Sequence, residues 1–126
     1  MTNSEWKGAT VLAGSAMEAL LLWAIEEHER KAPGSISTAA TALVITGALS
    51  QKLDNNPERW VLTELIEMAR HFTLIKDDTA RQARLCKDFR NLIHPGRAKR
   101  LGQVCDRGTA LSALAAVELV VRDLTP

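Results

Sequence analysis

The segment DFRNLIHPGR, residues 88–97, holds the residues of this chain best suited to acid–base and phosphate chemistry. Histidine exchanges a proton near neutral pH, and arginine binds phosphate oxygens through two parallel hydrogen bonds. Arg90 and His94 are about one helical turn apart, and Asn91 lies between them. Because Pro95 and Gly96 follow directly, the pair is predicted to lie at the end of a helix. Arg90, Asn91 and His94 are therefore the candidate catalytic residues.

Positive charge is concentrated around this pair. The whole chain has a net charge of +1, yet residues 81–107 contain eight Lys and Arg residues against two Asp residues. A local basic patch on a near-neutral protein suits an anionic partner such as a nucleic-acid backbone. The alternative is a solvated helix face whose Arg side chains cover the edge of the core.

Length and composition indicate one globular domain over residues 1–126. The chain is 46% hydrophobic and 25% charged, which is ordinary for a folded protein and argues against disorder. Cys86 and Cys105 are the only cysteines, and neither lies in a metal-binding spacing. We therefore expect no disulfide framework, no metal and no cofactor.

The sequence also predicts a cytoplasmic protein that does not associate with a membrane. The first residues, MTNSEW, lack the basic start and apolar run of a leader peptide. The apolar part of the longest uncharged stretch, TAATALVITGAL, is too short to cross a bilayer as a helix.

Helical periodicity recurs along the chain, and no strand pattern stands out. The sequences APGS, DNNP and Pro95-Gly96 interrupt this periodicity and leave short connections. The sequence therefore predicts an all-α fold, a compact bundle of about five helices. The expected helices cover residues 4–31, 37–53, 57–72, 78 or 79 to 94, and a last helix that begins at 106 or 109.

Helical spacing also predicts which residues face the core. In the first helix the expected stripe contains Trp6, Ala9, Ala13, Ala16, Leu20 and Trp23 and is widened by Val11, Leu12, Leu21 and Ile25. In the third helix the expected inward residues are Trp60, Leu62, Leu65, Ile66 and Ala69. At 100° per residue the fourth helix has an apolar arc of Leu85, Cys86, Phe89, Leu92 and Ile93. Its opposite arc contains Arg84, Lys87, Arg90, Asn91 and His94.

The segment CKDFRNLIHPGR, with GSAMEALLLWAI and LTELIEMARHFTLI upstream, resembles the HEPN superfamily of small bacterial helical domains over nearly the whole chain. Arg90, Asn91 and His94 match the family motif of an Arg, a polar residue and a downstream His, with a shorter Arg-to-His spacing than usual.

This resemblance implies a homodimeric, metal-independent endoribonuclease of a toxin–antitoxin or phage-defence system. In such a protein the Arg-His pairs of two subunits meet in one cleft. The implied partners are RNA and an antitoxin or other protein. The candidate RNA-binding residues are Arg84, Lys87, Arg97, Lys99 and Arg100.

A structural interpretation of the same motif remains open. Glu18 is the only charged residue between Lys7 and Glu26, and a partly buried carboxylate needs a partner. Arg90 is a candidate for that partner, and His94 would then cap the end of its own helix. In this interpretation the chain is a non-catalytic dimeric interaction module, and the motif ties helices together.

The remaining polar groups are expected to have no site function. His28 and the acidic run of Glu26, Glu27 and Glu29 are expected to be solvated, and His71 to be a packed or surface residue. The apolar faces of the first and last helices are too extensive for a bundle of this size to bury alone, which predicts a homodimer.

Overall fold

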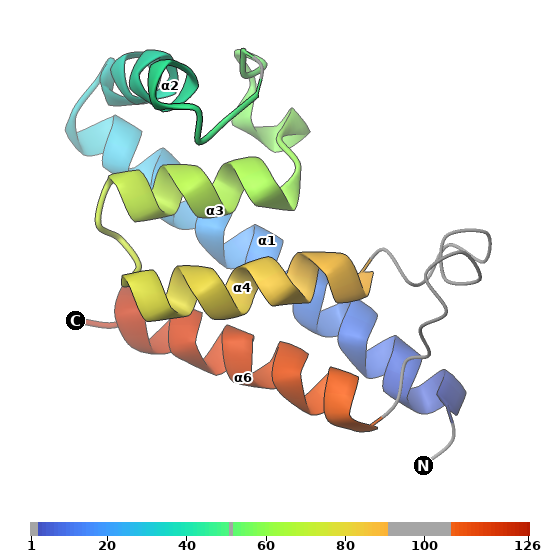
Figure 1. Ribbon diagram of the computed structural model, residues 1–126. Coiled ribbons are helices and arrows are strands. Elements are labelled where there is room, and N and C mark those ends of the chain that lie inside the picture. Colours follow the sequence, from blue (N-terminus) through green and yellow to red (C-terminus); the bar gives the residue numbers. More distant parts are fainter. Residues whose placement is uncertain (1–2, 51, 91–106) are drawn as a thin grey trace.

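The computed structural model describes residues 3–50, 52–90 and 107–126 (Figure 1). Within these ranges the chain forms five α-helices and one 3-10 turn and contains no strand, which confirms the predicted all-α bundle. The elements are α1 (Asn3–Lys31), α2 (Ser35–Thr46), η1 (Pro57–Arg59), α3 (Leu62–His71), α4 (Asp77–Arg90) and α6 (Arg107–Leu124).

The long helix α1 organises the other elements. Figure 1 shows α3, α4 and α6 side by side in one layer, with α1 crossing behind them and α2 above α3. α1 contacts each of the other described helices and packs most extensively against α6. The buried residues of α1 include Ala13, Met17, Leu21 and Ile25, which recur every four residues and so line one side of the helix.

The buried face of α1 matches the predicted stripe only in part. Ala13, Leu21 and Ile25 are buried as expected, but Leu12 and Trp23 are 72% and 59% exposed. Met17, which the predicted stripe leaves out, is fully buried.

α6 meets α1 and α4 through its small residues. Ala110, Ala113, Ala116 and Val120 are fully buried, while Leu111 and Leu114 on the same helix are 49% and 44% exposed. Alanine at the contact allows two helix backbones to approach closely, because no long side chain separates them. The larger leucines therefore remain on the outer side of α6.

α2 is shorter than predicted. It ends at Thr46, where Gly47 adopts φ 83° and donates its N–H to the carbonyl of Val44. Glycine reaches this left-handed conformation without the steric cost of a Cβ atom, so it ends the helix well before residue 53.

The third predicted helix is divided in two. Asn56 caps η1 by accepting the N–H of Glu58, and Pro57 takes the first position, as the sequence predicted. α3 then begins at Leu62, after the extended residues Trp60 and Val61. All the predicted inward residues are buried: Trp60, Leu62, Leu65, Ile66 and Ala69.

The predicted core face of α4 is wrong where the structure describes it. Leu85 is 49% exposed, and the fully buried positions are instead Thr79, Ala80 and Ala83. α4 contacts α1, α3 and α6, and the side that it buries carries these small residues rather than the bulky Leu85. The side chains of Cys86, Phe89, Leu92 and Ile93 lie outside the described part of the chain.

Among the described helices, α1 over Gly8–Lys31 is long and apolar enough to cross a membrane by length and composition alone. Central helices of soluble proteins share these two features, and α1 is the central helix of this bundle.

Candidate functional site

The structure describes only the first part of the predicted site. α4 extends to Arg90, and the side chains of Lys87 and Arg90 lie outside the described part of the chain. Five further predicted site residues also lie outside it, namely Asn91, His94, Arg97, Lys99 and Arg100. Among the predicted site residues, the structure describes the side chains of Arg84 and Glu18.

The backbone position of Arg90 can nevertheless be related to the buried face of α4. Arg90 follows Ala83 by seven residues, close to two helical turns, and Ala83 is fully buried. The two residues therefore lie on the same face of α4. On α1, Glu18 follows the fully buried Met17 and is itself half-buried, and it has an interaction partner.

Arg84 forms a two-point ion pair with Glu67 of α3. Its Nε atom donates a hydrogen bond to Oε2 of Glu67, and its Nη2 atom donates one to Oε1, both at 2.9 Å. The Glu67 side chain is only 9% exposed, and the Arg84 side chain is 40% exposed. The hydrogen bond to Glu67 raises the pKa of Arg84, against the opposing effect of burial. Such two-point pairs fix geometry as well as charge.

This ion pair was not predicted from the sequence. Arg84 was assigned to the polar arc as an RNA-binding residue, which stays a prediction, and Glu67 was not singled out. The feature that could have indicated this pair is the position of Glu67 in α3, where its neighbours Leu65, Ile66, Met68 and Ala69 are buried. Because α3 is buried on nearly all sides, its Glu67 carboxylate needs a charge partner. Arg84 of α4 binds it at two points, and Arg70 of α3 itself lies 3.7 Å away.

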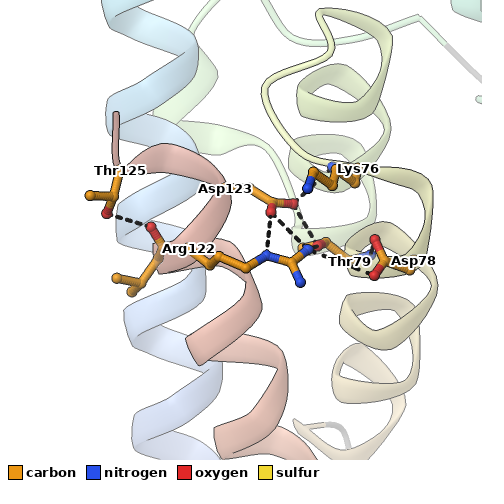
Figure 2. Close-up of polar contacts among 7 residues, drawn as sticks. Lys76, Asp78, Thr79, Arg122, Asp123 and Thr125 are labelled. Atoms are coloured by element: carbon orange, nitrogen blue, oxygen red, sulfur yellow. Dashed lines mark hydrogen bonds and ion pairs between the residues drawn. The ribbon is translucent and has the colours of Figure 1, made fainter.

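A second polar cluster holds the start of α4 against the end of α6 (Figure 2). One oxygen of the Asp123 carboxylate, Oδ2, accepts hydrogen bonds from the backbone N–H of Lys76 at 2.8 Å and from the hydroxyl of Thr79 at 2.5 Å. Its other oxygen accepts Arg122 Nε at 2.9 Å, and Arg122 also lies 3.7 Å from Asp78. Asp123 therefore caps the N-terminus of α4 from a helix more than forty residues later in the chain.

The Asp123 side chain is 2% exposed. Burial alone would raise the pKa of this carboxyl, but the hydrogen bonds from Lys76, Thr79 and Arg122 outweigh burial and lower the pKa below its usual range. Both polar clusters thus neutralise a buried carboxylate between α4 and a neighbouring helix.

Two predictions for the end of α1 are wrong. His28 is half-buried rather than solvated: its ring stacks on Phe72 at a centroid distance of 3.9 Å, and its Nδ1 lies 3.1 Å from Ser35 Oγ. Glu29 accepts the backbone N–H groups of Gly34 and Ile36 at 2.7 and 2.8 Å, which lowers its pKa and caps the start of α2. The turn after α1 brings Ser35 to His28 and the first N–H groups of α2 to Glu29, whereas Phe72 at the end of α3 supplies the ring on which His28 stacks.

Within the described ranges no three His, Cys, Asp or Glu side chains are placed to hold a metal ion. The chain matches no protein-family model, no curated protein and no solved structure. The candidate site is therefore defined by the sequence motif at the end of α4 and by the ion pairs that position this helix.

The lowered pKa of Asp123 predicts how the contribution of its carboxylate to the free energy of unfolding changes with pH. The contribution is present above the unfolded pKa of Asp, about 3.9, and is lost as pH falls through the lower folded pKa. We expect Asp123→Asn to lower the free energy of unfolding by about 1–3 kcal/mol at neutral pH. In urea denaturation the difference from wild type should shrink below about pH 4.

Glu118→Gln is the matched control for this experiment, because Glu118 is an exposed carboxylate on the same helix. It should leave the free energy of unfolding within about 0.5 kcal/mol of wild type. A stability difference for Asp123→Asn that stays constant down to about pH 2 would show that the ionised carboxylate is not the stabilising form.

Proposed function

We propose that this protein is a HEPN-like helical domain that binds RNA through the basic end of α4 and acts in a bacterial toxin–antitoxin or defence system. The observation that carries the proposal is the motif of Arg90, Asn91 and His94 followed by Pro-Gly, inside the most basic stretch of the chain. The all-α bundle is the fold class that this resemblance implies. An antitoxin or other protein is its expected partner.

The proposed activity is metal-independent cleavage of RNA. His94 removes the proton of a ribose 2′-hydroxyl, which then attacks the adjacent phosphorus and displaces the 5′-oxygen of the next nucleotide. Arg90 is the residue that the resemblance assigns to the phosphate, where it stabilises the charge that develops on the oxygens. The products are a cyclic phosphate end and a free 5′-hydroxyl.

The test is cleavage of a fluorescent single-stranded RNA in buffer that contains EDTA. Wild type should cleave the RNA, and His94→Ala should lower the rate by about 10² to 10⁴, the usual cost of losing a positioned base. His71→Ala is the matched control, since His71 is an exposed histidine at the end of α3. Cleavage that EDTA abolishes, or that His94→Ala leaves unchanged, contradicts this mechanism.

The proposal includes a homodimer, supported by apolar side chains that the described part of the fold leaves uncovered. Leu12 and Trp23 of α1 are 72% and 59% exposed, and α6 exposes Leu111, Leu114 and Val121. Exposed apolar surfaces of this kind are typical of sites where proteins associate.

We expect light scattering at micromolar concentration to give the mass of two chains. Leu12→Ser with Trp23→Ser should shift the mass toward that of one chain while the helical circular dichroism persists, because both side chains are largely exposed within the protomer. A one-chain mass for wild type across the micromolar range contradicts the dimer.

A second candidate function has its own supporting observation. Arg84, assigned to RNA from the sequence, is paired with Glu67, and Arg90 lies on the same face of α4 as the buried Ala83. In this candidate the arginines of α4 tie helices together, Glu18 is the partner of Arg90, and the chain is a non-catalytic interaction module. Its prediction for the cleavage assay is that wild type and His94→Ala are both inactive.

A further inference from the structure

A groove lies between α2 and the segment that connects α2 to α3. Its volume is about 800 Å³. Ile36, Ala40 and Val44 of α2 form one wall, residues 52–58 form the other, and the buried side chains of Leu53 and Trp60 also line it. The groove therefore has an apolar lining that spans two separate elements.

Polar contacts hold both walls in place. Glu29 binds the backbone N–H groups of Gly34 and Ile36 and so anchors the first turn of α2. On the other wall, Trp60 Nε1 donates to the carbonyl of Asp54 at 2.8 Å, and Asn56 caps η1. Because each wall is fixed by its own contacts, the groove is formed before any ligand arrives.

The shape of the groove fits a helix better than a compact small molecule. The α2 wall runs for ten residues, from Ile36 to Ile45, and these span roughly 14 Å at the helical rise. Near the end of α2, Val44 is 39% and Ile45 is 78% exposed. An elongated groove with an apolar rim accommodates an amphipathic helix, which presents apolar residues at every third or fourth position.

The charges at the rim favour a basic occupant. Glu26, Asp54 and Glu58 are exposed carboxylates that line the groove, and Lys52 is an exposed base there. Asp54 is partly engaged, because Arg59 lies 3.8 Å from it and the backbone N–H of Asn56 donates to it. The other base at the rim, Arg30, is paired with Glu27 at 2.8 Å. The rim is therefore negative overall, although the chain has a net charge of +1.

We propose that this groove binds an amphipathic helix of a partner protein, with the apolar face of that helix on α2 and Trp60 and its basic residues opposite Glu26, Asp54 and Glu58. α3 lies between α2 and the described part of α4 (Figure 1), so the groove is separate from the Arg84–Glu67 pair.

The probe is a fluorescein-labelled peptide of about 14 residues, roughly 21 Å as a helix, with leucines at helical spacing and lysines elsewhere. Its matched control replaces every lysine by glutamate. In fluorescence anisotropy the lysine peptide should bind the full chain, and its affinity should fall as salt is raised. The glutamate peptide should bind at least tenfold more weakly, because like charges face each other across the rim.

Two variants locate the binding site. Glu26→Gln with Glu58→Gln should weaken binding of the lysine peptide roughly three- to tenfold, since both side chains are exposed rim charges. Ile45→Ser should weaken it by a similar factor, and Glu118→Gln on α6 should not change it.

Three results would overturn the proposal. The first is equal binding of the two peptides, and the second is unchanged affinity in the rim and Ile45→Ser variants. The third is a change in particle mass for Ile45→Ser by light scattering, which would place a second copy of the chain in the groove.

Discussion

Covering the apolar side of α1 is the constraint on which the rest of this structure depends. Glu18 is the only charged residue of this helix between Lys7 and Glu26, so most of its length can be stabilised only by burial. Met17, Leu21 and Ile25 are fully buried, and burying a side chain of this size contributes about 1.5–3 kcal/mol. Every other described helix contacts α1, and these contacts bury its apolar side.

Charged groups then determine how the covering helices are placed around α1. Glu67 of α3 holds Arg84 of α4, Asp123 of α6 holds the first turn of α4, and Glu29 of α1 holds the first turn of α2. An ion pair at an interface adds little net stability compared with apolar contacts, but breaking one leaves a costly unpaired charge. These carboxylates therefore act chiefly on the alignment of neighbouring helices. Two of them, Glu67 and Asp123, hold α4, which carries the start of the candidate site.

The number of helices and the inward face of α3 are predictable from the sequence, because both depend on local periodicity and on breakers such as DNNP. The buried face of α4 cannot be predicted in this way. Apolar periodicity favours Leu85, whereas in the fold Ala80 and Ala83 are buried and Arg84 contacts α3. The role of Glu29 depends on how α2 folds back after Gly34, and the stacking of His28 depends on the position of Phe72 at the end of α3; no local pattern specifies either. The motif from Asn91 to His94 lies outside the described residues, so its chemistry rests on the sequence alone.

The central claim for the described part of the fold is that Arg84 ties α4 to α3 through Glu67. The most direct test compares urea unfolding of Arg81→Ala, Arg84→Ala and Arg90→Ala, three arginines on one helix. Arg81 is exposed, so its variant should unfold within about 0.5 kcal/mol of wild type. Arg84→Ala should cost about 1–3 kcal/mol, less than a fully buried pair because Arg84 is partly exposed.

Arg90→Ala should cost about 3–5 kcal/mol if Arg90 is the partner of Glu18, and Glu18→Gln with Arg90→Gln should recover much of the loss. Unfolding of Arg84→Ala at the same urea concentration as Arg81→Ala would contradict the central claim. The same result for Arg90→Ala would rule out its pairing with Glu18 and leave its guanidinium available to hold an RNA phosphate, as the proposed function requires.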